Sequence, residues 1–319
     1  MFFYGFFALL SAFGICGKTA YTTSMATQSI CAIVVTHRPD TTFRERLQAL
    51  APQVAHSLVI YNGFDSVPGD GPHGDHRTLL AHPVNNLSAA QNLGIRWARE
   101  HGHSHILLMD DDSTPSATMV TQLIATLPAK GIAVANLQEE DTPRALRHVV
   151  SENGYWGWPK RIHRGETLPN IVTAIASGSL IPLSVIEQVG LMDEQLVIDY
   201  IDKEFCLRLR SRGYSITMAG DAVLHHRIGK ASKHGPVTCL NHSPERRYTI
   251  WRNRAICIGR YSNCFTFVAF DLAGMVYDLI RVIGFESNKK HKLLAMWHGL
   301  IDAFSGQRRS TTFPVRTYG

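Results

Sequence analysis

The chain has 319 residues, of which 45% are hydrophobic and 18% are charged, and this balance excludes a disordered or collagen-like protein. Its formal net charge of +6 favours an anionic partner such as a nucleotide, a nucleic acid or an acidic membrane surface. The sequence has no helix-turn-helix, zinc-finger or aromatic RNA-binding motif, so we expect no nucleic-acid partner.

An apolar extension, residues 1–24, precedes Met25 and the first predicted strand. It has no basic region ahead of its hydrophobic run and is short for a membrane-spanning helix, which argues against a signal peptide. Two interpretations are open: a membrane-seeking segment, or residues upstream of the true start of the protein. We expect a chain that begins at Met25 to fold and to remain active.

The first half of the chain alternates short apolar runs with helical patterns. The predicted elements are, in order, a strand at 29–37, a helix at 43–53, a strand at 57–63, a helix at 88–102 and a strand at 106–109. This alternation predicts a parallel sheet covered by helices on both faces. No G-x-G-x-x-G motif follows the first strand, so a dinucleotide-dependent oxidoreductase is excluded.

Three aspartates, Asp110 to Asp112, follow the apolar run ILLM at the carboxyl end of the strand at 106–109. Ligands of such sheets bind beyond the carboxyl ends of the strands. Adjacent like charges are costly unless a cation neutralises them, and Mg²⁺ or Mn²⁺ accepts carboxylate ligands together with phosphate oxygens. The alternative is a solvated turn in which Asp112 caps a helix that begins near Ser116.

The second half of the chain is less regular. The stretch from Gln138 to Asn170 contains NGYWGWPKR and is long enough to be a functional loop or a lid. A helix is predicted after it, because Ile201, Phe205 and Leu209 recur at helical spacing and Gly213 ends the pattern.

The last part of the chain, residues 244–319, is first basic and aromatic and then mostly apolar. Asp271 and Asp278 interrupt the apolar run, and the lysines of SNKKHK follow it. These charges argue against a membrane span and for an amphipathic helix that lies on anionic lipid. A helix packed on the rest of the protein fits the same pattern equally well.

Two enzyme classes use an Asp-x-Asp pair at the end of a strand. The pattern Asp110-x-Asp112-x-Thr114 is similar to that of the haloacid-dehalogenase-type phosphatases, in which the first aspartate is a nucleophile and the second a general acid. In that family the motif normally ends the first strand of the core. Here two or more β-α units precede it and no convincing lysine motif follows, so a phosphohydrolase is the second choice.

Eight sequence blocks, taken together and in order, resemble the family 2 inverting glycosyltransferases of the GT-A fold, particularly the bacterial rhamnosyltransferase-like and galactofuranosyltransferase-like branch. They lie between about Ile30 and Tyr261 and read IVVTHRPD, LVIYNG, NNLSAAQNLGI, LLMDDDS, ASGSL, GLMDEQLVIDYIDKEFCLR, AVLHHRIG and YTIWRNRAI. The resemblance implies an α/β fold: a Rossmann-like, nucleotide-sugar-binding mixed sheet flanked by helices, with a C-terminal helical extension. It divides the chain into the extension 1–24, a GT-A catalytic domain at 25–243 and a helical, membrane-associating region at 244–319.

The resemblance also implies roles for individual residues. Asp202 is expected to be the general base that deprotonates the acceptor. Asp110, Asp112 and His226 are expected to hold Mg²⁺ or Mn²⁺ against the donor diphosphate. The expected donor contacts are Thr36, His37, Tyr61, Asn62, Asn92, Asp110, Asp111 and Arg252.

When the family resemblance is set aside, helix geometry and charge offer simpler roles for some of these residues. Asp202 would be a first-turn carboxylate favoured by the helix dipole, with Asp199 as N-cap. Glu204 would pair with Arg208 one turn on.

The chain departs from the family pattern at two places. Where relatives usually carry an aspartate that contacts the base, this chain reads Tyr61-Asn62-Gly63, so we expect Tyr61 to stack on the base or Asn62 to replace the aspartate. Where relatives often carry a glycine, it has Asn86, which tolerates a positive φ better than most residues.

The implied activity is metal-dependent transfer of a sugar from a dTDP- or UDP-sugar, with rhamnose from dTDP-rhamnose as the first expectation. The implied acceptor is a surface glycan or a lipid-linked glycan. We expect the protein in the cytoplasm, at the inner face of the cytoplasmic membrane, and six cysteines without a C-x-x-C pair fit that reducing compartment. A non-catalytic, membrane-peripheral protein is the non-enzymatic alternative.

Overall fold

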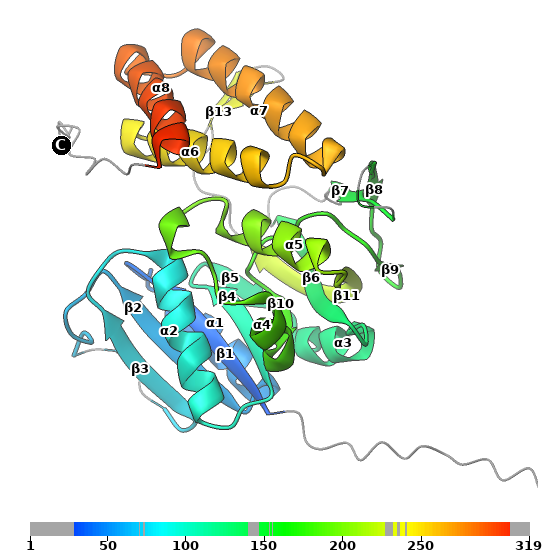
Figure 1. Cartoon of the computed structure of the whole chain (residues 1–319). Helices are drawn as coiled ribbons and strands as arrows, with labels where there is room; N and C mark the ends of the chain where they lie inside the picture. The colour runs from blue at the N-terminus through cyan, green and yellow to red at the C-terminus, as the bar shows by residue number, and fades with distance from the viewer. Residues whose placement is uncertain are drawn as a thin grey trace, which may run out of the picture.

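The computed structural model describes residues 29–69, 71–72, 74–139, 147–152, 154, 156–226, 232–234, 237–239 and 241–306, so the expectations for residues 1–24 lie outside it. Nine strands of the described chain form the central sheet, in the order β3-β2-β1-β4-β10-β6-β11-β5, with β9 paired to β11. Their bounds are β1 Ile30–Thr36, β2 His56–Asn62, β3 Arg77–His82, β4 His105–Asp110, β5 Ser113–Pro115, β6 Gly131–Glu139, β9 Thr167–Leu168, β10 Ser179–Pro182 and β11 Ser215–His226. The fold is the expected mixed α/β sheet flanked by helices (Figure 1).

The first four strands are parallel, as the β-α-β alternation predicts. Beyond these strands the sheet is mixed, as the resemblance implies, because β10 runs antiparallel to both β4 and β6. The short β10 leads directly into a helix at Leu183, and its four residues carry no signal of strand direction. The edge strand β3 was not predicted, since all six of its residues are only half-buried and show no alternation.

Helices cover both faces of this sheet. Alternate residues of β1 point to opposite faces, so that Ile33 packs beneath one helical layer and Val34 beneath the other. The first layer contains α2 (Leu87–Glu100), α4 (Leu183–Val189) and α5 (Ile201–Ser211), and the second contains α1 (Phe43–Leu50) and α3 (Met119–Thr126). Burial on both faces explains why β1 is apolar without interruption.

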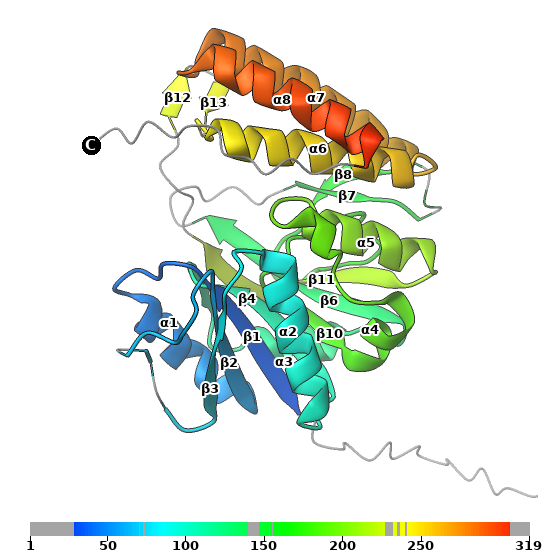
Figure 2. The same cartoon turned by 60° about the vertical axis from the view of Figure 1, so that its left-hand side comes forward.

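Three C-terminal helices form a separate layer beyond α5. They are α6 (Pro244–Arg260), α7 (Phe265–Gly284) and α8 (Lys289–Ser305), and in both views α6 lies between α5 and the other two (Figures 1 and 2). Ser243 caps α6 by accepting a hydrogen bond from the Arg246 amide. Among the helices that the structure describes, none is long and apolar enough to cross a bilayer.

Two small hairpins complete the described chain. One pairs β7 (Arg147–Val150) with β8 (Trp158–Arg161), within the stretch that the sequence assigned to a loop or lid. The other pairs β12 (Ser232–His234) with β13 (Val237–Cys239), just before α6.

The contact between α6 and α8 depends on a glycine. A Cβ atom at Gly299 of α8 would lie 2.6 Å from the carbonyl oxygen of Tyr248 in α6, and a backbone atom cannot move aside as a side chain can. We expect Gly299→Ala to lower the free energy of unfolding by ~1–3 kcal/mol, measured by urea denaturation. Gly259→Ala, in α6, meets no atom within 4 Å and is expected to raise it by ~0.5 kcal/mol. Equal effects of the two changes would contradict this account of the helix packing.

Candidate active site

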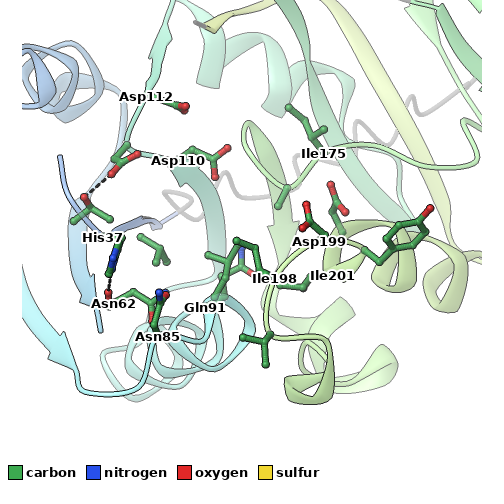
Figure 3. A pocket seen from close by; sticks show the side chains of 18 of the residues that line it. His37, Asn62, Asn85, Gln91, Asp110, Asp112, Ile175, Ile198, Asp199 and Ile201 are labelled. Atoms are coloured by element: carbon green, nitrogen blue, oxygen red, sulfur yellow. Dashed lines mark hydrogen bonds between the residues drawn. The ribbon is translucent and has the colours of Figure 1, made fainter. Parts of the chain in front are cut away.

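A cavity of about 770 Å³ opens beyond the carboxyl ends of β1, β2 and β4. Asp110 and Asp112 lie on one side of it, and Ile198, Asp199 and Ile201 lie on the opposite side (Figure 3). Sheet-derived residues therefore face the turn that leads into α5. The cavity is lined by Val35, Thr36, His37, Asn62, Asn85, Leu87, Gln91, Asp110, Asp111, Asp112, Leu137, Ile175, Ala176, Val197, Ile198, Asp199, Tyr200, Ile201, Asp202, Lys203, His226, Arg246 and Ile250.

The three aspartates at the end of β4 have different surroundings. The hydroxyl of Thr36 donates to Asp111 Oδ2 at 2.5 Å, and Arg46 Nε donates to the Asp111 carbonyl at 2.6 Å. Asp110 is less well supported: burial first, and then the charges of Asp112, Asp111 and Asp202, raise the pKa of its carboxyl to about 7. The site therefore concentrates negative charge, as a cation-binding site does.

His226 reaches these acids through the pairing of β5 with the end of β11. That pairing sets His226 opposite Ser113, whose Oγ lies 3.0 Å from His226 Nδ1. The same nitrogen lies 3.3 Å from Asp112 Oδ1. Residues 114 positions apart in the chain therefore meet at one corner of the cavity, as the resemblance implies. Asp112 does not cap α3, which begins at Met119 without a side-chain cap.

Carboxylate oxygens of this kind suit Mg²⁺ or Mn²⁺. Among the described residues, no group of three or more His, Cys, Asp or Glu side chains is arranged to hold a metal ion. Ions of this type are commonly held by one or two carboxylates, with substrate phosphates and water completing the shell. Asp110, whose pKa is raised first by burial and then by the neighbouring acids, fits such a shared site.

Asp202 also lines the cavity, from the first turn of α5. Its Oδ1 accepts a hydrogen bond from the Lys203 amide at 2.8 Å, and burial raises the pKa of its carboxyl. A carboxylate with a raised pKa at a cavity wall is suited to accept a proton. Glu204 is different, because it is buried and bonded to Arg208 and to the Tyr261 hydroxyl, as its helical spacing predicts for the arginine.

Two consecutive left-handed residues place Asp202. Asp199 has φ of 60° and Tyr200 has φ of 68°, a conformation that costs such residues about 1 kcal/mol or more each. The expected N-cap at Asp199 is wrong: Tyr200 occupies the cap position without a side-chain bond. Asp199 instead pairs with Arg246 of α6, through contacts of 3.0 and 3.2 Å. Asn253 of α6 donates to the carbonyls of Ile198 and Asp199, so α6 holds the turn.

Eight of the residues named from the sequence line this one cavity. They are Thr36, His37, Asn62, Asp110, Asp111, Asp112, Asp202 and His226. His37 and Asn62 are joined, because His37 Nδ1 lies 2.7 Å from the Asn62 carbonyl oxygen (Figure 3). The Asn62 side chain donates to Asn85 Oδ1 and accepts from the Asn86 amide, so it also shapes the turn before α2.

Three of the named residues lie elsewhere. Tyr61 points to the opposite face of the sheet from Asn62 and contacts Phe64 edge-on in the core. Asn92 is buried, and its amide bonds to the backbone of Met192 and to Glu194. Arg252 lines a separate cavity of about 330 Å³ and donates to the Gln195 carbonyl.

The structure adds cavity residues that the sequence analysis did not name. Gln91, one position before Asn92, lines the cavity, and its Oε1 is buried without a hydrogen-bond partner. Lys203 and Arg246 line it as well. The sequence analysis named Asn92 on α2, whereas the adjacent amide, Gln91, is the one that lines the cavity.

No protein-family model matches the chain. It is 26% identical over 289 residues to the dTDP-rhamnosyl transferase RfbF of Shigella flexneri, with 89% of this chain and 97% of the relative covered. It is 26% identical over 263 residues to the galactofuranosyltransferase GlfT1 of Mycobacterium tuberculosis, with 73% and 83% covered. This chain is a relative of the family 2 glycosyltransferases.

Solved structures agree with this relationship at the level of the fold. The structure of S. aureus TarS 1–349 in complex with UDP-GlcNAc superposes with a TM-score of 0.55 at 12% identity and covers 86% of this chain and 81% of that one. GalNAc-T7 with UDP, GalNAc and Mn²⁺ gives 0.55 at 12% identity, and the match covers 74% of this chain and 50% of that one. The chain has the GT-A fold of these proteins.

The charge on Asp110 leads to a prediction about stability. A carboxyl whose folded pKa is raised to about 7 from the ordinary 3.8 destabilises the folded state increasingly as pH rises between these values. We therefore expect Asp110→Asn to raise the melting temperature of metal-free protein by roughly 2–4 °C at about pH 8, and by less at about pH 5, in thermal unfolding followed by circular dichroism. The exposed Asp65→Asn serves as the control and is expected to show no such gain. A gain for Asp110→Asn that is larger at the lower pH would contradict the charge argument.

Proposed function

We propose that this chain transfers a sugar from a nucleoside diphosphate sugar to a glycan, with inversion at the anomeric carbon. The observation that supports this most strongly is that Asp110, Asp112, His226 and Asp202 all line one cavity. In such a transfer the acceptor oxygen forms a bond to the anomeric carbon, the bond from that carbon to the diphosphate breaks, and the acceptor proton moves to a base.

Asp202 is the base in this proposal. Its carboxyl lines the cavity, and burial raises its pKa, so it binds a proton more strongly than an exposed aspartate. The hydrogen bond from the Lys203 amide fixes one carboxylate oxygen. The other oxygen is then available to the acceptor hydroxyl, whose proton it takes as the new glycosidic bond forms.

Asp110, Asp112 and His226 are the proposed ligands of Mg²⁺ or Mn²⁺. Such an ion, when bound, supplies positive charge to the leaving diphosphate. Thr36 orients Asp111 beside them, and Arg46 fixes the Asp111 carbonyl. Mn²⁺ accompanies UDP in the GalNAc-T7 structure, which supports the same choice of ion here.

Rhamnose from dTDP-rhamnose is the proposed donor group, because the similarity to RfbF extends over 97% of that relative. Galactofuranose is the second candidate, from the weaker similarity to GlfT1. His37 and Asn62 are the proposed contacts on the nucleotide side, since both line the cavity while Tyr61 does not. A panel of nucleotide sugars with Mg²⁺ or Mn²⁺, scored by released nucleoside diphosphate, distinguishes the donors.

The proposed acceptor is a surface glycan carried on a lipid, and the proposed location is the inner face of the cytoplasmic membrane. The basic balance of the chain, +6 at neutral pH, favours an anionic membrane. A lipid-linked acceptor would require the cavity to work close to that surface.

The metal motif has its own test. We expect Asp112→Asn to weaken donor binding at least about tenfold, since it removes one of two acidic ligands of the cation, and EDTA treatment to have a similar effect on the unmodified chain. Calorimetric titration with donor and Mn²⁺ measures both. Normal donor binding and turnover in both cases would rule out the metal assignment, and release of phosphate from simple phosphoesters would favour the phosphatase.

The base is tested by separating rate from affinity. We expect Asp202→Asn to lower kcat by ~10²–10⁴-fold while the donor Kd changes only a few-fold, because a base acts on the acceptor and not on the donor. Glu204→Gln is the neighbouring control, and we expect it to reduce stability, through its bonds to Arg208 and Tyr261, more than the chemical step. Near-normal turnover of Asp202→Asn, together with a Glu204→Gln variant that folds but is inactive, would show that Asp202 is not the base.

A further inference from the structure

The helix α7 has its charged groups on the inside and its apolar groups on the outside. Asp278 is 3% exposed and binds Arg247 and Arg254 of α6 at 3.1 and 2.9 Å. Asp271 is buried as well and accepts a hydrogen bond from the Tyr200 hydroxyl. The two acids that interrupt the apolar run in the sequence therefore face α6 and α5, and the solvent side of α7 is left to apolar residues.

The outer face of α7 is a continuous apolar stripe. Its residues recur at intervals of four, four and three, as one face of a helix does, and each is about half exposed: Leu272, Val276, Ile280 and Ile283. Large apolar side chains that are singly exposed need no explanation, but a stripe of this length on one helix does.

The β7–β8 hairpin extends this face with aromatic side chains. Trp156 is 57% exposed and Trp158 is 72% exposed. The Trp156 ring lies 4.5 Å from the ring of Phe265, the first residue of α7, and the Gly157 amide donates to the Thr266 hydroxyl at 2.7 Å. The hairpin is thus attached to the first turn of α7, beside which Figure 1 shows it. It is the segment that the sequence marked as a functional loop and that the proposed chemistry does not use.

Basic residues flank the apolar stripe at both ends of α7. Lys160 and Arg161 are exposed on β8, next to the two tryptophans. Lys289 and Lys290 are exposed at the start of α8, directly after α7. Lys292 of the same basic run is instead buried against Glu286, so only part of the lysine cluster expected from the sequence faces outward.

We propose that the β7–β8 hairpin and the outer face of α7 together form the surface by which this protein docks on an anionic lipid bilayer. The proposal deepens the proposed function, since it rests on a lipid-linked acceptor. Tryptophan rings prefer the boundary between acyl chains and headgroups, aliphatic side chains enter the chains beneath it, and lysines contact anionic headgroups. A second copy of the chain fits less well, because a symmetric pairing of this face would bring like charges together.

Docking through α7 would also bring the catalytic turn near the lipid. The inner side of the same helix binds Tyr200 and Lys203 through Asp271, and these two residues flank Asp202. The proposed membrane face is thus on one side of α7, and the residues that flank Asp202 contact its other side. An acceptor anchored in the bilayer would have a short path to Asp202.

Vesicle sedimentation of the full chain tests the surface. With vesicles of phosphatidylcholine and phosphatidylglycerol, we expect Trp156→Ser with Trp158→Ser to lower the partition coefficient at least about tenfold, and Ile280→Asn with Ile283→Asn to lower it similarly. Ile124→Asn on α3 is the matched control, being an exposed isoleucine on another part of the molecule, and should leave binding unchanged. Removing phosphatidylglycerol should weaken binding of the unmodified chain.

A second measurement needs no variant. Lipids brominated near the headgroup are expected to quench part of the tryptophan fluorescence of the unmodified chain, and the Trp156→Ser, Trp158→Ser double variant should lose that quenching. Binding that is instead lost on changing only Trp297 of α8 would overturn the proposal, as would a dimer, detected by light scattering, that the α7 variants dissociate. Vesicle binding without turnover of any nucleotide sugar would contradict the proposed function alone; turnover of a soluble acceptor without vesicle binding would contradict this inference alone.

Discussion

Buried ionic contacts between α6 and α7 are the constraint on which the rest of the structure depends. Asp278 lies between Arg247 and Arg254, and removing one member of such a set leaves a buried charge unpaired, at a cost of about 3–5 kcal/mol. The acids of α7 must therefore face α6, which turns its apolar residues to the solvent. Through Arg254 and Asp271 the same contacts hold Tyr200, and so the turn before Asp202.

At the cavity end of the sheet, by contrast, acidic side chains lie next to one another. Asp110, Asp111 and Asp112 lie together, and burial with the charges of its neighbours raises the pKa of Asp110 to about 7. A fold selected for stability alone would not retain such a group. Arg247 and Asp278 pair with one another, whereas neighbouring acids surround Asp110. That contrast separates the paired charges of α6 and α7 from the acids that line the cavity.

The sequence predicts much of this arrangement because the signals are local. Apolar runs and helical spacing gave β1, β2, β4, α1, α2 and α5, and the block order gave the GT-A fold and the cavity acids. Tyr61 and Asn92 do not line the cavity while their chain neighbours Asn62 and Gln91 do, since neighbours on a strand or a helix face different sides. Arg246 meets Asp199 across 47 residues, and β10 runs antiparallel to β4, from which about seventy residues separate it. Tertiary contacts of this kind leave no mark in a short stretch of sequence.

The support that α6 gives to the turn at Asp199 has a consequence for how such proteins diverge. Arg246 and Asn253 hold the backbone that presents Asp202, although they follow the catalytic region in the chain. The C-terminal helices are therefore poor candidates for exchange between relatives as an independent module. In a chimaera joined near Ser243, the turn before Asp202 would come from one protein and the α6 residues that hold it from another. Changes in the packing of α6 and changes in the turn before Asp202 are therefore expected to evolve together in this chain.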